Sequence, residues 1–342
     1  MHHAERIRDR EIICFFSLAS ADLYLSLAAL PISYWTLIAA SSLGTASFLF
    51  VASAQGGLTA LFAQQHALSG QISAVWNIFA FLPAAVAFVI GGYFSQFLEI
   101  QSPDRISRVL FSVQAILSIA VFAFSFLKPR SVFDNVVAEK RSLHIPKPSL
   151  NGLVRHLPVY PALAIWLLWN FSPGSITPLQ YFLQNRLGAT DVQWGIWNAV
   201  FTGSFIPAFV VYGFLSPRIT FKSLLWLGTL LAIPQFAPLL FVNSLEQGLI
   251  CAAPIGLMGG IATAAYLDLI IRSCPRGLQG TMIMMSGGIY FLSTRVGDIV
   301  GTYLYGRFDG FESCVVMMIS TYALIPFVLM AVPKDVLGDD AS

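Results

Sequence analysis

The sequence predicts an all-α protein that crosses a membrane many times. Of its 342 residues, 56% are hydrophobic and 11% are charged, whereas a soluble domain carries about 25% charged residues. No Asp, Glu, Lys or Arg occurs from Leu23 to Leu98, a stretch of 76 residues. One spanning helix needs roughly 20 apolar residues, so this stretch crosses a bilayer more than twice. These observations exclude a soluble globular protein, and they exclude a transmembrane barrel, whose strands alternate every second residue.

Ten apolar segments predict ten transmembrane helices. The first follows Arg6, Arg8 and Arg10 like a signal peptide, but Asp22 lies inside it and further spanning segments follow at once, so we expect a retained helix. The segments cover residues 11–29, 34–62, 72–95, 107–127, 157–183, 192–215, 221–242, 248–271, 280–305 and 312–332.

The distribution of basic residues supports this count. With a cytoplasmic N-terminus, 14 Lys and Arg fall in inside loops and 4 in outside loops, while Arg295 lies within a segment. Cytoplasmic loops are enriched in Lys and Arg, and a wrong count would disturb the sorting. We therefore expect both termini in the cytoplasm. The short loops and the lack of an organellar presequence favour a bacterial inner membrane.

One long hydrophilic stretch, residues 128–156, divides the chain. It carries six basic residues and Pro129, Pro146 and Pro148, which predicts a flexible cytoplasmic linker. The expected domains are a four-helix N-terminal bundle over 1–127, this linker, and a six-helix C-terminal bundle over 157–342.

Two motifs carry a family resemblance. Residues 172–188 read SPGSITPLQYFLQNRLG, and residues 274–281 read CPRGLQGT. The first resembles the seventh helix of the folate-biopterin branch of the major facilitator superfamily, and the second resembles the loop before that branch's eleventh helix. The superfamily's layout of six helices, a basic loop and six more helices is also similar. The resemblance implies that the first two helices are lacking, either because the gene model starts late or because the protein has lost them.

Four positions depart from the folate-biopterin pattern. That branch carries acidic residues where this sequence has Gln55, Thr59, Gln64 and Gln279. If those acids carry protons or bind the pterin in relatives, this chain cannot use them in that way. Folate is therefore in doubt as the substrate, and the first three residues stay candidates for solute contact as neutral hydrogen-bonding groups.

The ninth segment contains two charges, Arg295 and Asp298, spaced i and i+3 on one helical face. A charge at the bilayer centre costs at least ~2.5–3.5 kcal/mol, so such residues are rare and usually functional. Arg295 is a candidate anchor for an anionic solute, with Asp298 setting its charge state or coupling to a proton. The alternative is a self-neutralising pair that holds helices together.

Two further acids lie within segments. Asp22 is a candidate proton site, a partner for Arg295, or a residue near a helix end. Asp268 precedes Arg272 by four residues near the cytoplasmic end of its segment, which favours a gate or a local ion pair over a solute contact.

The fifth segment is interrupted by polar residues and prolines. Proline frees a backbone carbonyl, which is tolerated where the helix lines a cavity or where neighbouring groups satisfy it. The alternative is a kink that only serves gating. Asn170, Ser172 and Gln180 are the candidate solute contacts, and Pro173 and Pro178 the candidate gating residues. Four tryptophans of the fifth and sixth segments are candidates for stacking on a flat ligand, for anchoring at the membrane interface or for lipid contact: Trp166, Trp169, Trp194 and Trp197. Two GxxxG spacings, 256–260 and 297–301, indicate close helix packing.

Three classes of function remain. The first is a secondary transporter of a small organic solute that works by alternating access, with proton coupling as an option. The second is a transporter-like protein that assists assembly of a membrane complex without transport. The third, a membrane enzyme, has no HExxH or other catalytic pattern to support it. We expect no metal, cofactor or nucleic-acid partner; the expected partners are the bilayer and the solute. A monomer is the family expectation, with a dimer as the alternative if two helices are lacking.

Overall fold

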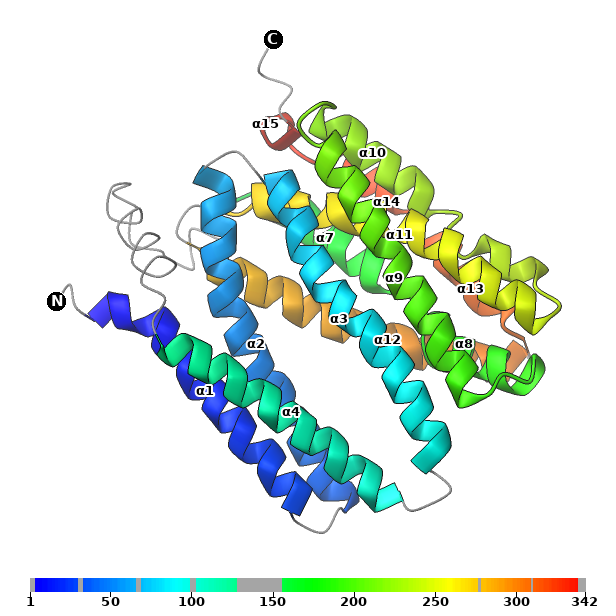
Figure 1. Cartoon of the computed structure of the whole chain (residues 1–342). Coiled ribbons are helices and arrows are strands. Elements are labelled where there is room, and N and C mark those ends of the chain that lie inside the picture. The colour runs from blue at the N-terminus through cyan, green and yellow to red at the C-terminus, as the bar shows by residue number, and fades with distance from the viewer. Residues whose placement is uncertain are drawn as a thin grey trace. The chain divides into compact units, whose positions relative to one another are not determined.

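The computed structural model describes residues 4–29, 33–65, 69–98, 103–127, 156–275, 278–308 and 310–337. Over these ranges the chain is helical and contains no strand, which confirms the all-α prediction (Figure 1). The long helices are α1 (Ala4–Ala29), α2 (Tyr34–Gln65), α3 (Ser69–Leu98), α4 (Pro103–Phe126), α9 (Asp191–Leu215), α11 (Leu245–Arg272) and α12 (Gln279–Phe308). The shorter ones are α7 (Val159–Asn170), α8 (Thr177–Tyr181), α10 (Phe221–Ala232), α13 (Glu312–Tyr322), α14 (Ile325–Leu329) and α15 (Lys334–Leu337), with a π-helix η1 (Phe182–Arg186) and a 3₁₀ helix η2 (Ala237–Phe241).

Eight stretches within the described ranges are long and apolar enough to cross a membrane. They correspond to predicted segments one to four, six to eight and ten. The fifth predicted segment begins with the 12-residue apolar helix α7. The ninth is the single helix α12, whose 30 residues extend for about 45 Å at 1.5 Å per residue. The ten segments of the sequence are thus all helical, and several are broken.

Contacts divide the chain into two compact units. The first contains residues 1–62, 97–152 and 275–287; the second contains residues 63–96, 153–274 and 288–342. Helix α3 thus packs with the C-terminal helices. The predicted domain boundaries stay a prediction, since residues 128–155 of the linker lie outside the described ranges.

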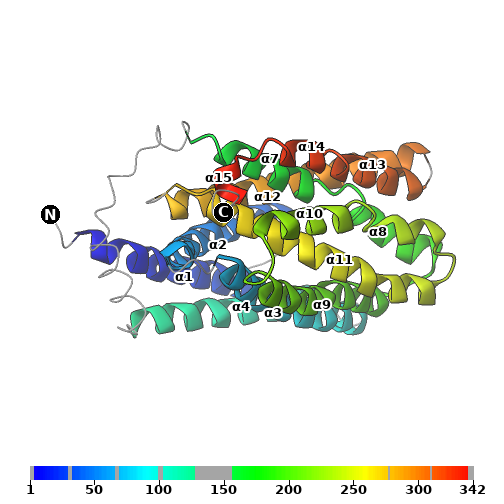
Figure 2. The same cartoon turned by 90° about the horizontal axis from the view of Figure 1, so that it is seen from above.

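In the first unit, α1 and α4 lie side by side (Figures 1 and 2). The rings of Tyr24 and Phe111 stack between them at 6.3 Å. Helix α2 joins this pair through Phe16 and Phe50, whose rings stack at 4.3 Å. Gly44 of α2 leaves the space that the Tyr24 ring occupies. Many large apolar side chains on these helices are exposed in the structure, as expected for surfaces that face lipid.

In the second unit, α9 and α11 form the centre. Gly256 and Gly260 of α11 meet the backbone of Phe201 and Phe205 of α9, where a Cβ atom would collide. This confirms the GxxxG spacing as a close-packing surface. Helix α3 adds to α9 through Phe81, whose ring stacks on Phe205 at 4.8 Å. Figure 2 shows α7 beside α14, and the two helices are in contact.

Local sequence signals set the ends of α9. Gly188 takes a φ of 74°, a left-handed conformation that glycine adopts without strain, and turns the chain after η1. Thr190 then caps α9: its hydroxyl accepts from the Gln193 N–H, and the Gln193 side chain accepts from the Thr190 N–H. This capping box satisfies two N–H groups that lack partners within the helix.

Candidate functional site

The fifth predicted segment is broken at its polar centre. Helix α7 ends at Asn170 and α8 begins at Thr177, so the residues from Phe171 to Ile176 lie in neither helix. Pro173 is buried in the break, and Pro178 lies at the start of α8, where a missing N–H costs nothing. The Asn170 side-chain amide donates to the Trp166 carbonyl at 2.7 Å, within its own helix.

Helix α12 packs directly against this break. A Cβ at Gly297 would lie 2.9 Å from the Ser172 nitrogen, and a Cβ at Gly301 would overlap the Pro173 carbonyl oxygen. The second GxxxG spacing therefore lets α12 approach the unwound backbone, as the packing interpretation of these glycines predicts.

Asp298 binds the first residue of α8 with both carboxylate oxygens. The Thr177 N–H donates to Oδ1 at 2.9 Å, and the Thr177 hydroxyl donates to Oδ2 at 2.9 Å. Hydrogen bonds to a carboxylate are about twice as strong as neutral ones. We call this pair of hydrogen bonds the Asp298–Thr177 clasp. It fixes α8, the part of the broken helix after the break, to α12.

Arg295 has a different environment from Asp298. Its side chain is exposed, and within the described ranges no ion pair joins it to Asp298 or to another acid. Sequence spacing placed the two charges on one face, but the structure gives Asp298 to Thr177 and leaves the guanidinium of Arg295 accessible.

The other side of the break rests on α13. Ser172 Oγ lies 3.2 Å from the Met318 sulphur, and Gly174 admits the Met318 and Cys314 side chains. Trp169, just before the break in the sequence, is buried, and the centre of its ring lies 5.1 Å from that of Tyr322. Trp197 is also buried, and its indole N–H donates to the Gly248 carbonyl at 3.0 Å. Both tryptophans therefore serve packing, and stacking on a flat ligand is not available to them here.

Gln180 begins a chain of hydrogen bonds. Its amide donates to Gln184 at 3.1 Å, and the Gln184 amide donates to the Asp191 carboxylate at 2.7 Å. Ser95 of α3 donates to the other oxygen of Asp191, also at 2.7 Å. Asp191 lies in the first turn of α9, where the helix dipole favours a negative charge. These hydrogen bonds tie the broken helix to α9 and α3.

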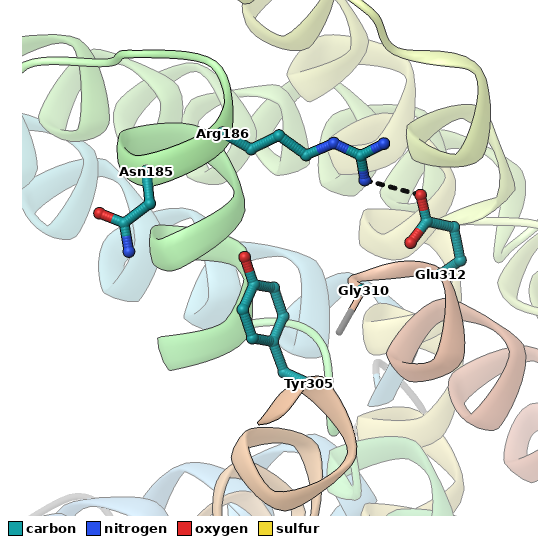
Figure 3. Close-up of a pocket in the computed structure, with 5 residues that line it drawn as sticks. All are labelled: Asn185, Arg186, Tyr305, Gly310 and Glu312. Atoms are coloured by element: carbon teal, nitrogen blue, oxygen red, sulfur yellow. Dashed lines mark hydrogen bonds and ion pairs between the residues drawn. The ribbon is translucent and has the colours of Figure 1, made fainter. Parts of the chain in front are cut away.

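A cavity of about 410 Å³ lies where η1 approaches the ends of α12 and α13. Figure 3 shows its lining: Asn185, Arg186, Tyr305, Gly310 and Glu312. Arg186 reaches across to Glu312, with 2.7 Å between Nη1 and Oε1, and both side chains are about half exposed. The hydrogen bond and the charge of Glu312 raise the pKa of Arg186 above its ordinary value. Exposed pairs of this kind contribute at most about 1 kcal/mol, so this contact can open readily.

Asp268 lies near the C-terminal end of α11, where it forms a buried polar cluster. Its carboxylate accepts from the Tyr212 hydroxyl at 2.9 Å and from Arg272 Nε at 2.9 Å. The Arg272 guanidinium lies 4.3 Å from the centre of the Phe221 ring. Asp268 itself is fully buried. The ion pair with Arg272 is the local one that the spacing predicted, while the bond from Tyr212 adds an interhelical link.

The remaining candidates lie on α1 and α2. Asp22 is exposed on α1. On α2, Gln55 is exposed and its carbonyl accepts from the Thr59 hydroxyl at 3.0 Å. The Gln64 side chain lies outside the described part of the structure.

Sequence reasoning missed three residues of these clusters: Thr177 as the partner of Asp298, Tyr212 as the partner of Asp268, and Asp191. Spacing along one helix finds neighbours three or four positions away, and Thr177 and Asp298 are 121 positions apart. The helix N-cap sequence around Asp191 was the one signal that could have found a member of this group.

Comparison with known proteins decides the family. The model of the Major Facilitator Superfamily matches residues 4–302. The chain belongs to the major facilitator superfamily. It is thus a multi-pass integral membrane protein of a family of transporters, a family that binds small solutes within the membrane.

Solved structures with this superfamily's fold align over nearly the whole chain. They include the human organic anion transporter MFSD10 (TETRAN), with 16% identity and a TM-score of 0.64 over 94% of this chain and 77% of the other. A bacterial homologue of the iron transporter ferroportin, in its outward-facing state, gives 13% identity and 0.65 over 95% and 82%. The E. coli fucose:proton symporter FucP gives 13% and 0.63 over 94% and 83%. No curated protein matches the sequence. At these identities the likeness shows the fold alone.

Proposed function

We propose that this superfamily member is a secondary active transporter that moves a small organic anion across the membrane by alternating access. The family supports transport of a solute. The substrate class is argued from the site: the Asp298–Thr177 clasp engages the one acid near Arg295 on α12, and Arg295 stays exposed with no ion pair in the described chain. An intramembrane cation without a partner on its own helix suits an anionic group of the solute.

The residues of the proposed site have distinct roles. Arg295 binds the anion. Asp298 holds the start of α8, so that the break from Phe171 to Ile176 keeps its shape. Asn170, Ser172 and Gln180 lie in the broken helix or at its break, and the hydrogen bonds of their side chains brace it. Proton coupling is assigned to Asp298 or Asp22, since each is an acid within a predicted spanning segment, where ionisable residues are rare and often carry protons.

The folate-biopterin relationship enters this proposal only as ancestry. Gln55, Thr59, Gln64 and Gln279 supply no carboxylate, so we do not propose that the chain carries a pterin through those positions. We further propose that four helices precede the linker and six follow it, and that both termini lie in the cytoplasm. The proposed location is a bacterial inner membrane.

Uptake into proteoliposomes tests the role of Arg295. The purified protein is assayed with a panel of radiolabelled carboxylates and phosphate esters, with a pterin included. A hydrogen-bonded ion pair is worth about 1.5–3 kcal/mol, so Arg295→Gln should lower kcat/KM at least about tenfold, and Arg295→Lys should recover part of it. Arg307→Gln is the matched control, because Arg307 is exposed at the end of the same helix.

Two results would contradict the proposal. Equal kcat/KM for the wild type and Arg295→Gln would remove Arg295 from the site. Uptake by folded wild-type protein no greater than in protein-free vesicles, across the whole panel, would favour the alternative of a transporter-like protein that assists assembly of a membrane complex.

A further inference from the structure

The cavity between η1 and the ends of α12 and α13 contains none of the residues of the proposed anion site (Figure 3). Its five lining residues all belong to the second compact unit. Its volume of about 410 Å³ falls within the range of about 300–1,000 Å³ that is usual for pockets that hold small molecules. Arg186 and Glu312 give the lining one positive and one negative charge, and Asn185 and Tyr305 add neutral hydrogen-bonding groups.

Packed aromatic rings hold the walls of the cavity in place. Phe182, the first residue of η1, stacks on Phe311, which immediately precedes α13, with 4.8 Å between the ring centres. Both rings are at most 2% exposed, and the guanidinium of Arg186 lies 5.7 Å from the centre of the Phe182 ring. On the α12 side, the Tyr305 ring meets the Tyr181 ring at 6.0 Å. The lining therefore rests on packed elements, as a preformed binding site requires.

The element that supplies Asn185 and Arg186 is a π-helix. In η1 the Leu187 N–H donates to the Phe182 carbonyl, five residues back, at 3.2 Å. Turns of this kind are rare, and they occur frequently at functional sites. Here the π-helical turn carries both of the η1 residues that line the cavity, which points to a role of the cavity in binding.

The ion pair in the cavity is built so that a ligand can replace it. Within the described part of the chain, it joins Nη1 of Arg186 to Oε1 of Glu312 alone, at 2.7 Å, and both side chains are about half exposed. A Cβ at Gly310 would lie 2.5 Å from Oε2 of Glu312, so this glycine leaves room for the second carboxylate oxygen. Exposed pairs with a single contact are weak. Each partner can therefore exchange the other for a charged group of a ligand.

The two charges together determine the class of ligand. An anion that binds Arg186 leaves the Glu312 carboxylate beside it without a partner, and a cation that binds Glu312 does the same to Arg186. A zwitterion replaces both partners at once. Its anionic oxygen accepts from the guanidinium, and a primary ammonium donates its N–H groups to the carboxylate. A trimethylated ammonium has no N–H and cannot make the second bond.

The cavity lies at the level of the lipid headgroups. The 30 residues of α12 extend for about 45 Å, whereas the hydrocarbon core is about 30 Å thick, so the last turn of the helix, with Tyr305, lies beyond that core. Tyr181 and Tyr303 have exposed side chains nearby in the sequence, and tyrosine is enriched at the membrane–water interface. Ligands can therefore reach the cavity from the aqueous phase or from the bilayer.

We propose that this cavity binds a small zwitterion with a primary ammonium and a carboxylate or phosphate group. Arg186 binds the anionic oxygen, Glu312 binds the ammonium, and Asn185 and Tyr305 add hydrogen bonds. The zwitterion is either a free solute of the amino acid type or the headgroup of an ethanolamine phospholipid. The site does not depend on the transport function proposed above, because binding is measured without transport.

Isothermal titration calorimetry on the full-length protein tests the proposal. The protein is placed in nanodiscs of phosphatidylcholine and phosphatidylglycerol, which contain no ethanolamine lipid. The probes are glycine and phosphoethanolamine, and their matched controls are glycine betaine and phosphocholine, in which methyl groups replace the N–H groups. We expect the primary amines to bind at least about tenfold more tightly than their methylated counterparts, the factor that a hydrogen bond to a charged group provides.

Substitutions at the ion pair identify the site. Arg186→Gln and Glu312→Gln should each weaken binding at least about tenfold. The matched controls are Arg307→Gln and Glu246→Gln, which should change nothing: both residues are exposed, and Glu246 lies in the first turn of α11 as Glu312 lies in the first turn of α13. Unchanged binding in Arg295→Gln separates the cavity from the proposed anion site. Tighter binding of phosphoethanolamine in Glu312→Gln would overturn the zwitterion in favour of a simple anion.

Nanodiscs that contain phosphatidylethanolamine distinguish the two sources. If the lipid headgroup occupies the cavity, these nanodiscs should abolish binding of the soluble probes, and native mass spectrometry should show more phosphatidylethanolamine than phosphatidylcholine retained by the wild type but not by Arg186→Gln. If a free solute is the ligand, the soluble probes should bind equally in both kinds of nanodisc. Absence of binding by both primary amines, together with equal retention of the two lipids, would overturn the proposal.

Discussion

Removing one hydrogen bond of the Asp298–Thr177 clasp should lower the free energy of unfolding by a measurable amount. Thr177→Val keeps the shape of the side chain and the backbone N–H, but it removes the hydroxyl that donates to Oδ2 at 2.9 Å. A hydrogen bond to a charged group is worth about 1.5–3 kcal/mol, and interhelical bonds measured within membranes reach at most about 1.7 kcal/mol. We therefore expect a loss near 1.5 kcal/mol, or slightly more than about tenfold in the unfolding equilibrium.

A double-mutant cycle in detergent-induced unfolding measures this energy. The cycle combines Thr177→Val with Asp298→Asn, and Thr177→Ser should restore most of the loss because serine keeps the hydroxyl. Thr294→Val is the matched control: the Thr294 hydroxyl donates to the Tyr290 carbonyl in its own helix at 2.7 Å, so its removal should cost a few tenths of a kcal/mol. Additive effects of the two clasp mutations, or equal effects of Thr177→Val and Thr294→Val, would refute the clasp.

Two further predictions concern packing and the buried acid. Asp268→Asn should destabilise the protein by roughly 2 kcal/mol, less than the about 3–5 kcal/mol for a fully buried pair, because the side chain of its arginine partner is 32% exposed; unfolding free energy measures it, and a loss under a few tenths of a kcal/mol would contradict the buried cluster. Gly301→Ala should cost at least about 2 kcal/mol through overpacking against the broken helix, whereas Gly306→Ala should be neutral or stabilising; equal unfolding midpoints for the two variants would refute close approach at Gly301.

The sequence was sufficient to predict the helical architecture, because in a membrane the apolar composition of a segment determines where a helix can lie. Charge-free stretches have to be helical in lipid, so the segments could be placed without knowledge of their neighbours. The interruption of the fifth segment was also predictable, because Pro173, Gly174 and Pro178 disfavour a continuous helix. A second break, between α10 and η2, was missed although Pro234 lies in it. Proline alone does not decide this, since α3 continues through Pro83.

Partners between helices could not be predicted. The sequence placed Asp298 beside Arg295, but the carboxylate binds Thr177, since packing of α12 on the break brings those atoms together. Asp268 is the intermediate case: its i+4 partner Arg272 followed from spacing, and Tyr212 of α9 did not. Such contacts depend on crossing positions that the glycines permit but a single sequence does not specify.

Solute counterflow shows whether the protein transports an anion by alternating access. Proteoliposomes are preloaded with an unlabelled organic anion and diluted into a trace of the same labelled anion. An alternating-access transporter exchanges one molecule for another, so label should accumulate transiently above equilibrium in wild-type vesicles, and this accumulation should be lost in Arg295→Gln. Label that never exceeds its level in protein-free vesicles, for any anion of the panel and with folded protein, would contradict transport of an organic anion by this protein.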